Sequence, residues 1–450
     1  MSEAPQPQAQ PQFDPDAPHQ VRPKLRALRG FPLNAKGPDG KPIQLMGLAD
    51  ARQISPEIVA TSPAAQQILP MLDGSRTVDE ILAQVEGLPE TFLKPFVAQL
   101  DKAGLIFGPN YEKIAAKMRE EFDSTPILPP GASAQIADQM VVQTLGQNAT
   151  PEQKAELGPK KLSDAIDTWI ETGLKDATPP AFENLPKAVI APHMDYQRGW
   201  NNYAHAYGRL KGLTPPDRVV ILGINHFGES TGVCGCDKGF STPLGEFAPD
   251  TDLIEALRSK LGDGLYANRF DHEREHSVEL QLPWIQRTLL ADGAPAPKVF
   301  AALIHDPVVN QGASYDGNGI DLDPFIEALI ESLDSLGGKT LVVGAVELAH
   351  AGRAFGDDVQ LGGQDEAANT FREKIRQTDQ ELLEQVTSGA VDDLLGTLAW
   401  RQNPNRWNST GALVAAIRVA RGESVQMLNY ADASDPQGVS LVTSAAMAIT

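Results

Sequence analysis

The stretch "DRVVILGINHFG", residues 217–228, decides the fold, because it predicts a buried strand that ends close to a histidine. Its apolar residues run without polar alternation and are largely β-branched, which is typical of a strand covered on both faces. The same pattern recurs in "KAVIAPH" (187–193), "KVFAALIH" (298–305) and "KTLVVGAVELAH" (339–350). These four segments predict the strands of a largely parallel or mixed sheet.

Helical patterns separate the predicted strands. In "GWNNYAHAYGRLKGL" (199–213), Trp200, Tyr203, Tyr207 and Leu210 recur at helical spacing. A helix between two buried strands predicts a right-handed βαβ crossover. Three later helical stretches each end at or beside a glycine, as many helices do: 323–338, 365–389 and 409–422. The larger part of the chain is therefore predicted to be α/β, with helices packed on the sheet.

The charge balance of the sequence limits the kinds of partner that the protein can be expected to bind. The 450 residues include 38 Lys and Arg against 59 Asp and Glu, which gives a formal net charge of -21. Because nucleic-acid binding depends on clustered cations that neutralise phosphates, this balance argues against a nucleic-acid surface. It favours small-molecule or protein partners. The length predicts one small and one large domain.

No targeting or membrane segment is recognisable in the sequence. The N-terminus has neither a basic start nor an apolar core, so a secretory signal is not expected. No apolar run approaches the roughly 20 residues that cross a bilayer. The sequence therefore predicts a cytoplasmic protein without membrane association. Cys234 and Cys236, the only cysteines, are expected to be reduced side chains in a hairpin.

Composition and pattern divide the chain into four parts. Residues 1–20 are rich in Pro and Gln and predict a disordered tail. Residues 21–125 are expected to form a small N-terminal domain. Residues 126–180 alternate helical stretches with Pro and Gly breaks, which indicates a helical connector. Residues 181–450 hold the α/β domain.

The segment 60–109 predicts a small winged-helix-like α+β domain. Amphipathic stripes indicate three helices, with "DGSRT" (73–77) as a turn and cap before the second, and "AGLIFG" (103–108) as a short strand after the third. A DNA-reading winged helix is the competing interpretation. The third helix, "LPETFLKPFVAQLDKAG" (88–104), has no excess of basic residues, which weakens that interpretation.

Histidines follow all four predicted strands: His193, His226, His305 and His350. Half of the eight histidines of the chain thus occupy equivalent places. The carboxyl ends of parallel strands meet at one edge of a sheet, where loops converge over a crevice. Because imidazole is a common ligand of iron, zinc and copper, the pattern predicts a metal-binding cleft.

Polar companions distinguish three of these histidines from the fourth. Asp195, Asn225 and Glu347 stand near His193, His226 and His350 in the sequence. A metal-bound imidazole is usually oriented by a carboxylate or a carbonyl at its second nitrogen. Asp195 and Asn225 are also candidates for substrate binding. His305 lacks a comparable companion and is left out of the site.

The segment "DHEREHSVELQLPW", residues 271–284, adds a further candidate group. Glu275 and His276 lie at the predicted start of a helix. Acidic residues at this place can simply suit the helix dipole. A histidine beside a glutamate can instead transfer protons, which makes His276 a candidate acid/base group and Glu275 a candidate substrate-binding residue.

The large domain resembles the Memo-like family, known as protein B of the AmmeMemoRadiSam system. The resemblance rests on six segments in family order: "IAPHMDYQRGW", "VVILGINHFG", "FSTPLGEF", "HEREHSVELQLPWIQ", "VVGAVELAHAG" and "LNYADASD". The N-terminal part resembles the PqqD-like family of peptide-binding winged-helix modules in its helical pattern and in the residues "DG.RT..EI". The pairing implies a peptide or modified protein as a possible partner.

The resemblance implies a fold related to the class III extradiol dioxygenases, which hold non-haem Fe(II) on two histidines and a third ligand. His193 and His226 would be the metal pair. The chain lacks the cysteine that some members have after "LNYA", and Asp435 is the nearest candidate third ligand. A turn residue before Pro436 is the alternative interpretation of Asp435. Fe(II) is the expected metal, with zinc or copper as alternatives.

The resemblance also implies roles for the remaining site residues. His276, His350 and Glu347 are the candidate catalytic residues. His276 and His350 would be acid/base or outer-shell groups, and Glu347 stands where the family usually has aspartate. The chain also lacks a cysteine in "RWNSTGALVAA" (406–416), which argues against a thiol mechanism. Three functions remain open: an iron-dependent oxidoreductase on a small molecule or peptide, a non-catalytic binding scaffold with a vestigial cleft, and metal-assisted hydrolysis.

Overall fold

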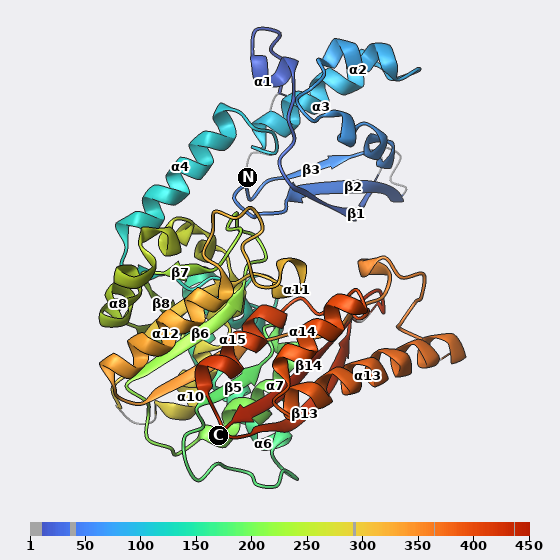
Figure 1. The fold of residues 1–450 in the computed structure, drawn as a ribbon. Coiled ribbons are helices and arrows are strands. Elements are labelled where there is room, and N and C mark those ends of the chain that lie inside the picture. The colour runs from blue at the N-terminus through green and yellow to red at the C-terminus, as the bar shows by residue number, and fades with distance from the viewer. Residues whose placement is uncertain (1–10, 37–41, 291–293, 364, 436) are drawn as a thin grey trace. The chain divides into compact units, whose positions relative to one another are not determined.

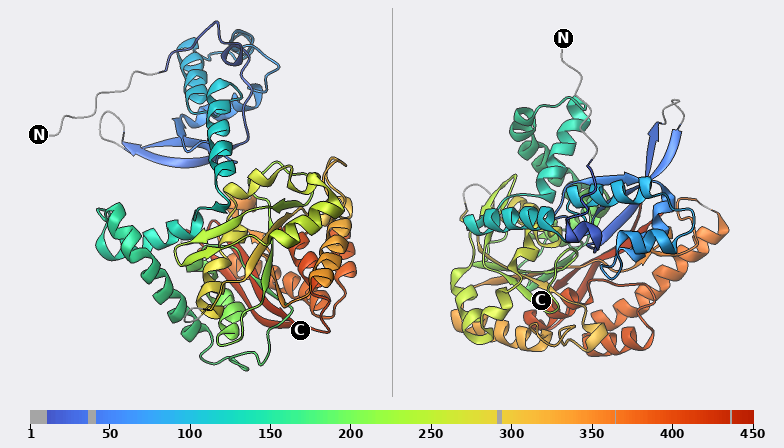
Figure 2. Two further views of the ribbon diagram at one scale, coloured as in Figure 1. Left: turned by 90° about the vertical axis from the view of Figure 1, so that its left-hand side faces the viewer. Right: turned by 90° about the horizontal axis from the view of Figure 1, so that it is seen from above.

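The computed structural model describes residues 11–36, 42–290, 294–363, 365–435 and 437–450. The chain forms two compact units, residues 1–125 and residues 126–450 (Figures 1 and 2). Each unit has a hydrophobic core of its own. None of the helices in the described part of the chain combines the length and the apolar character that crossing a bilayer requires.

Unit 1 contains a three-stranded antiparallel sheet with the order β1-β2-β3. The strands are β1 (Leu28–Lys36), β2 (Pro42–Asp50) and β3 (Ile58–Thr61). The helical elements are α1 (Pro18–Val21), the 3-10 turns η1 (Pro63–Gln67) and η2 (Leu69–Met71), α2 (Val78–Gln84), α3 (Glu90–Lys102) and α4 (Pro109–Ser124). Thr77 and Glu80 form a reciprocal capping box at the start of α2, which confirms the predicted cap.

The small α+β fold of unit 1 is confirmed, but three predicted details are wrong. The first predicted helix is a pair of short 3-10 turns, because Pro70 lacks the backbone donor that a continuous helix would need at this position. In place of the strand predicted over 103–108, the structure has an isolated bridge between Leu25 and Ile106. The sheet precedes the helices, in a segment whose sequence had not indicated strands.

The predicted N-terminal tail ends earlier than expected. Its first ten residues lie outside the described residues. From residue 18 the chain forms α1, and the buried Gln20 side chain donates a hydrogen bond of 2.7 Å to Asp101 of α3. Residues 18–21 are therefore part of the folded unit.

Unit 2 is built on an eight-stranded mixed sheet. Neighbouring strands are hydrogen-bonded in the order β12-β14-β5-β11-β6-β10-β7. The eighth strand, β13, pairs with β14. The strands are β5 (Ala188–Ala191), β6 (Arg218–Ile224), β7 (Cys234–Cys236), β10 (Lys298–Ile304), β11 (Thr340–Ala345), β12 (His350–Ala351), β13 (Val425–Ser434) and β14 (Leu441–Ile449). The four predicted strands are β5, β6, β10 and β11, and they pair in parallel.

Helices pack on this sheet, as predicted, and they cover both of its faces (Figure 1). On one face α15 packs on β5, β6 and β11 with α12 beside it, and on the other α7 packs on β5, β13 and β14. The longer helices are α5 (Ala132–Leu145), α6 (Pro151–Gly173), α7 (Tyr196–Tyr207), α8 (Thr251–Leu261), α10 (Leu282–Leu289), α12 (Leu322–Leu336), α13 (Glu366–Thr387), α14 (Val391–Trp400) and α15 (Thr410–Ala420). The short elements are β4 (Ile127–Leu128), η3 (Gly208–Leu210), β8 (Gly239–Thr242), β9 (Gly245–Phe247), η4 (Asp263–Tyr266), η5 (Arg269–Glu273), α9 (His276–Glu279), α11 (Pro307–Asn310) and η6 (Arg353–Phe355).

The segment expected as a separate connector belongs to the compact unit 2. β4 pairs in parallel with β8, and α6 packs against α7. Trp169 of α6 stacks on Trp284 of α10, with ring centroids 5.9 Å apart. Residues 126–180 therefore contribute to the core of unit 2.

Two strands at the C-terminus were not predicted. Every residue of β14 is buried, and β14 pairs with β5, β12 and β13. Its sequence, "LVTSAAMAI", is rich in small and polar residues, so its apolar signal is weak. The pairing also corrects one predicted detail, because His350 lies in β12 beside β14 and not at the end of β11.

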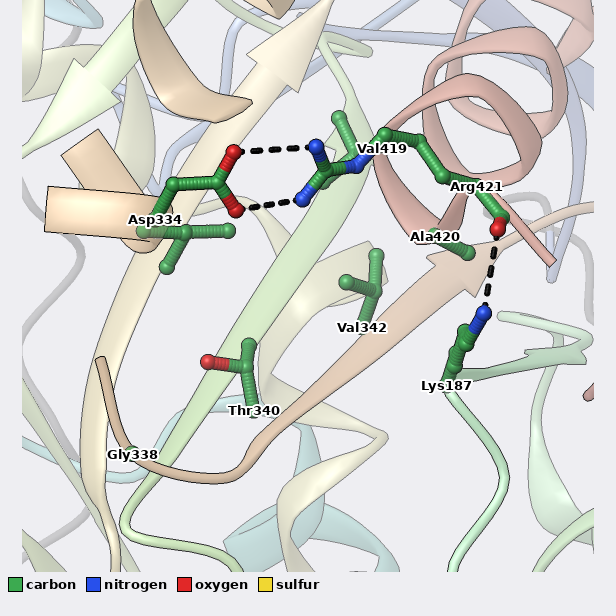
Figure 3. Close-up of a pocket in the computed structure, with 9 residues that line it drawn as sticks. Lys187, Asp334, Gly338, Thr340, Val342, Val419, Ala420 and Arg421 are labelled. Atoms are coloured by element: carbon green, nitrogen blue, oxygen red, sulfur yellow. Dashed lines mark hydrogen bonds and ion pairs between the residues drawn. The ribbon is translucent and has the colours of Figure 1, made fainter. Parts of the chain in front are cut away.

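A pocket of about 460 Å³ lies at the edge of the sheet where β11 begins (Figure 3). Arg421, in the left-handed conformation that ends α15, pairs with Asp334 of α12. Its carbonyl accepts a hydrogen bond of 3.1 Å from the Lys187 ammonium group. These contacts join α12, α15 and the start of β5 at the edge opposite to the one where His193 and His226 follow their strands.

Candidate metal centre

Three histidines converge at the carboxyl edge of the sheet in unit 2. His193 follows β5, His226 follows β6, and His276 opens α9. Each offers one ring nitrogen, and the three nitrogens lie within 4.8 Å of one another. The ring centroids of His193 and His226 are 5.0 Å apart, and that of His276 lies 5.7 Å and 4.6 Å from them. Parallel strands that end at one edge bring the first two together.

The segment 275–281 fixes the third histidine against the other two. The backbone N–H of Ile224 donates to the Ser277 hydroxyl oxygen, and this hydroxyl donates to the Ile224 carbonyl, which anchors α9 to the end of β6. A Cβ atom at Gly223 would lie only 2.4 Å from the Ser277 oxygen, so glycine permits this approach. Gln281 donates to the carbonyl of Pro192, the residue before His193.

Glu275 orients His226. The Nδ1–H group of His226 donates to Glu275 Oε1 over 2.9 Å, and the backbone N–H of His226 donates to Oε2. This leaves Nε2 of His226 as the nitrogen with a free lone pair. Burial lowers the pKa of His226, but the hydrogen bond and charge of Glu275 outweigh it and the pKa is raised. Burial raises the pKa of Glu275, and its contacts with His226 reverse this and lower it to about 2.

His193 is fully buried and neutral. Burial lowers its pKa to about 3, against the opposing charge of Glu347. The Ser409 hydroxyl donates to Asn408 Oδ1, so its oxygen, 3.1 Å from His193 Nε2, accepts the imidazole N–H. The Nδ1 atom therefore carries the lone pair. It has no hydrogen-bond partner in the structure and lies 3.4 Å from a carboxylate oxygen of Glu347.

Glu347 lies between His193 and His350. One of its oxygens faces His193, and the other lies 3.2 Å from His350 Nε2. Burial raises the pKa of Glu347, but the electrostatic interaction with the neighbouring His193 and His350 imidazoles and the His350 hydrogen bond outweigh burial and lower it to about 2. The Glu347 carboxylate is therefore ionised at neutral pH.

The donor set fits a metal ion. A buried lone pair on His193 and an ionised carboxylate stand 3.4 Å apart, an arrangement that a cation stabilises. Burial also lowers the pKa of His276, so this imidazole is neutral and can act as a ligand. Outer carboxylates behind imidazole ligands are typical of protein metal sites, and Glu275 occupies such a place behind His226.

Asp435 does not join this group, which corrects its predicted role as third ligand. It lies in the turn between β13 and β14, where its carboxylate accepts the backbone N–H groups of Gln437 and Ser440. The turn interpretation of Asp435 is the one that the structure supports. His276, which was expected as a proton-transfer group, lies beside His193 and His226 in the place predicted for Asp435.

The predicted substrate-binding residues are occupied by local contacts. Asp195 accepts the backbone N–H of Arg198 at the start of α7 and pairs with the Arg198 side chain. The Asn225 amide donates to Asp271 and its oxygen accepts the Gly228 N–H group. Glu275 is buried against His226. These contacts hold the three side chains in place, and the Asp195 side chain is still 44% exposed. The role of the three residues in substrate binding stays a prediction.

Sequence reasoning missed Ser277, Gln281, Asn408 and Ser409. Ser277 and Gln281 are buried polar residues within the apolar run "HSVELQLPW", and buried polar groups need partners. This polar and apolar alternation was the signal that could have revealed them. Asn408 and Ser409 precede α15 and carry no comparable signal in the sequence.

The fold and the site define an α/β protein with a candidate three-histidine metal centre at the carboxyl edge of its sheet. A family model described as "Memo-like protein" matches residues 156–449. The chain belongs to this family. The match begins within α6, which agrees with the packing of that helix into unit 2.

Curated relatives support the family membership. A MEMO1 family protein of Methanopyrus kandleri is 28% identical over 290 residues, which cover 62% of this chain and 89% of the relative. A MEMO1 family protein of Thermus thermophilus is 24% identical over 360 residues, which cover 79% of this chain and 93% of the relative. A MEMO1 family protein of Aquifex aeolicus is 25% identical over 309 residues, which cover 68% and 71%.

Proposed function

We propose that unit 2 is a metal-dependent enzyme, an oxidoreductase that uses non-haem iron on a small molecule or peptide. The observation that supports this function best is the convergence of His193, His226 and His276 within 4.8 Å, next to an ionised carboxylate. Three protein ligands leave coordination positions open for a substrate, as in catalytic metal sites. When bound, iron would supply Lewis acidity and one-electron chemistry at these open positions.

The outer residues would hold and move protons. His350 donates its Nδ1–H to the Leu348 carbonyl, so its exchangeable proton sits on Nε2. A neutral His350 can accept the Asn408 amide at Nε2, 3.3 Å away, and a protonated one can donate to Glu347. We assign His350 and Glu347 together as the proton-transfer group of the reaction. Glu275 would keep the Nε2 lone pair of His226 directed to the metal.

Metal analysis with a spectroscopic probe tests this function. Protein purified without oxygen is expected to retain or take up stoichiometric Fe(II), and nitric oxide, which binds open positions on Fe(II), should give a high-spin iron–nitrosyl EPR signal. The variant His193→Ala with His226→Ala is expected to lose both the iron and the signal. Zinc in place of iron would favour metal-assisted hydrolysis, and no metal under any condition would favour a scaffold.

Unit 1 supports a second function, the capture of a peptide. Among the strands that the structure describes, β3 pairs only with β2, so its other edge is open. A groove of about 320 Å³ runs beside this edge and is lined by Pro11, residues 57–60, Gln99, Lys102 and Ala103. Ile58 is 54% exposed there. An open strand edge beside a groove of mixed polar and apolar lining can bind an extended peptide as an added strand.

Peptide selection against the intact protein tests this second function. Peptides enriched from a displayed library are expected to bind the wild type and to lose binding to Ile58→Glu, which places a charge in the groove. Val309→Glu, at a site in unit 2 that is 65% exposed, is the matched control and should bind like the wild type. Peptides that bind Ile58→Glu unchanged would rule out the groove.

A further inference from the structure

Glu279 ends α9, three residues after His276, and its carboxylate contacts the chain segment where α5 begins. It is buried, and it accepts the backbone N–H groups of Gly131, Ala132 and Ser133, each over 2.9 Å. The Ser133 hydroxyl donates to the same carboxylate. A carboxylate at the N-terminus of a helix, here α5, is also favoured by the helix dipole.

The helix that carries His276 depends on such anchors. α9 has only four residues, a length at which helices have little stability of their own. Ser277 fixes one side of it to Ile224, the last residue of β6. Glu279 fixes its other end, and the partner is a segment about 145 residues away along the chain. The position of the His276 ring is therefore set from two directions.

The partner segment is the start of unit 2. The division between the two units falls at residues 125 and 126, and α5 begins at Ala132. Between them, Ile127 and Leu128 of β4 pair with β8, and the Pro126 carbonyl accepts the Gly239 N–H group. Residues 126–133 thus follow directly on unit 1 and contact the helix of the metal centre through Glu279.

We propose that Glu279 is a positioning residue of the metal centre, which couples the order of residues 126–133 to the placement of His276. This inference rests on the proposed metal site and extends it to the chain segment that enters unit 2. Coupling is reciprocal, so metal binding at the histidines must also stabilise residues 131–133.

Cobalt titration of the intact protein tests the proposal. Co(II) is the probe, because its visible absorption reports both the affinity and the geometry of the ligands. In Glu279→Gln an amide N–H group faces backbone donors, so α9 loses its anchor. We expect Co(II) affinity to fall about 10–100-fold, the usual range for residues behind the ligands, and the absorption bands of the bound ion to shift. Ser133→Ala, which removes one donor of four, should give a smaller change in the same direction.

Hydrogen exchange provides the second readout. In the wild type, Co(II) should slow the exchange of the amides of residues 131–133, and in Glu279→Gln this effect should disappear. Glu80→Gln is the matched control, because Glu80 also accepts at a helix start but belongs to unit 1. An equal affinity, spectrum and exchange response in Glu279→Gln and the wild type would overturn the proposal. A wild type that binds no Co(II) would instead overturn the proposed metal site, and this inference with it.

Discussion

Replacing His276 with alanine is expected to abolish stoichiometric metal binding. His276 supplies one of the three nitrogens that lie within 4.8 Å of one another. Loss of a ligand should cost more than the roughly 10–100-fold loss of affinity that follows the removal of an outer partner. Isothermal titration of the intact protein with Zn(II), compared with the wild type, measures this loss.

Asp435→Ala is the informative control for this prediction. The Asp435 carboxylate is engaged with the turn between β13 and β14, so its removal should leave metal affinity unchanged. A large loss of affinity in Asp435→Ala with retained affinity in His276→Ala would restore the two-histidine and aspartate arrangement expected from the sequence. Circular dichroism of both variants establishes that each is folded.

Replacing Trp284 with alanine is expected to lower the free energy of unfolding by about 3–5 kcal/mol, the usual cost of removing a buried tryptophan. The Trp284 side chain is fully buried. Its ring stacks on Tyr203 at 5.2 Å and on Trp169 at 5.9 Å, and meets Tyr196 edge-on at 5.8 Å. This cluster joins α6, α7 and α10, so the change leaves a cavity among three helices.

Trp400→Ala is the matched control, because Trp400 is 85% exposed at the end of α14. Its effect should stay within about 0.5 kcal/mol, as is usual for surface substitutions. Urea unfolding followed by circular dichroism, with the transition of unit 2 analysed separately, compares the two variants. Equal destabilisation by both would show that the aromatic cluster does not stabilise unit 2.

In unit 2, the sequence predicted the four central strands of the sheet, β5, β6, β10 and β11, but not the C-terminal strands β13 and β14. β5, β6, β10 and β11 are buried on both faces, so they appear as uninterrupted apolar runs. β14 is equally buried, but its small and polar residues gave no such run. In unit 1, β1 and β2 pair over nine residues through the backbone, and their mixed side chains did not indicate strands.

The sequence predicted two of the three candidate ligands from topology. His193 and His226 follow parallel strands, so strand order alone brings them to one edge. His276 belongs to a helix whose place depends on side-chain anchors such as Ser277 and Glu279, and those contacts cannot be deduced from spacing. Asp435 was predicted as a ligand because it is the nearest candidate in the sequence to the place where some family members have a cysteine. Nearness along the sequence does not show that a side chain reaches the other ligands in space.

Anomalous diffraction from crystals grown with Co(II), collected on either side of the cobalt absorption edge, locates the metal site of unit 2. We expect a strong anomalous peak bonded by ring nitrogens of His193, His226 and His276. A peak at the Asp435 turn, or crystals with bound cobalt elsewhere and none on these three imidazoles, would contradict this expectation.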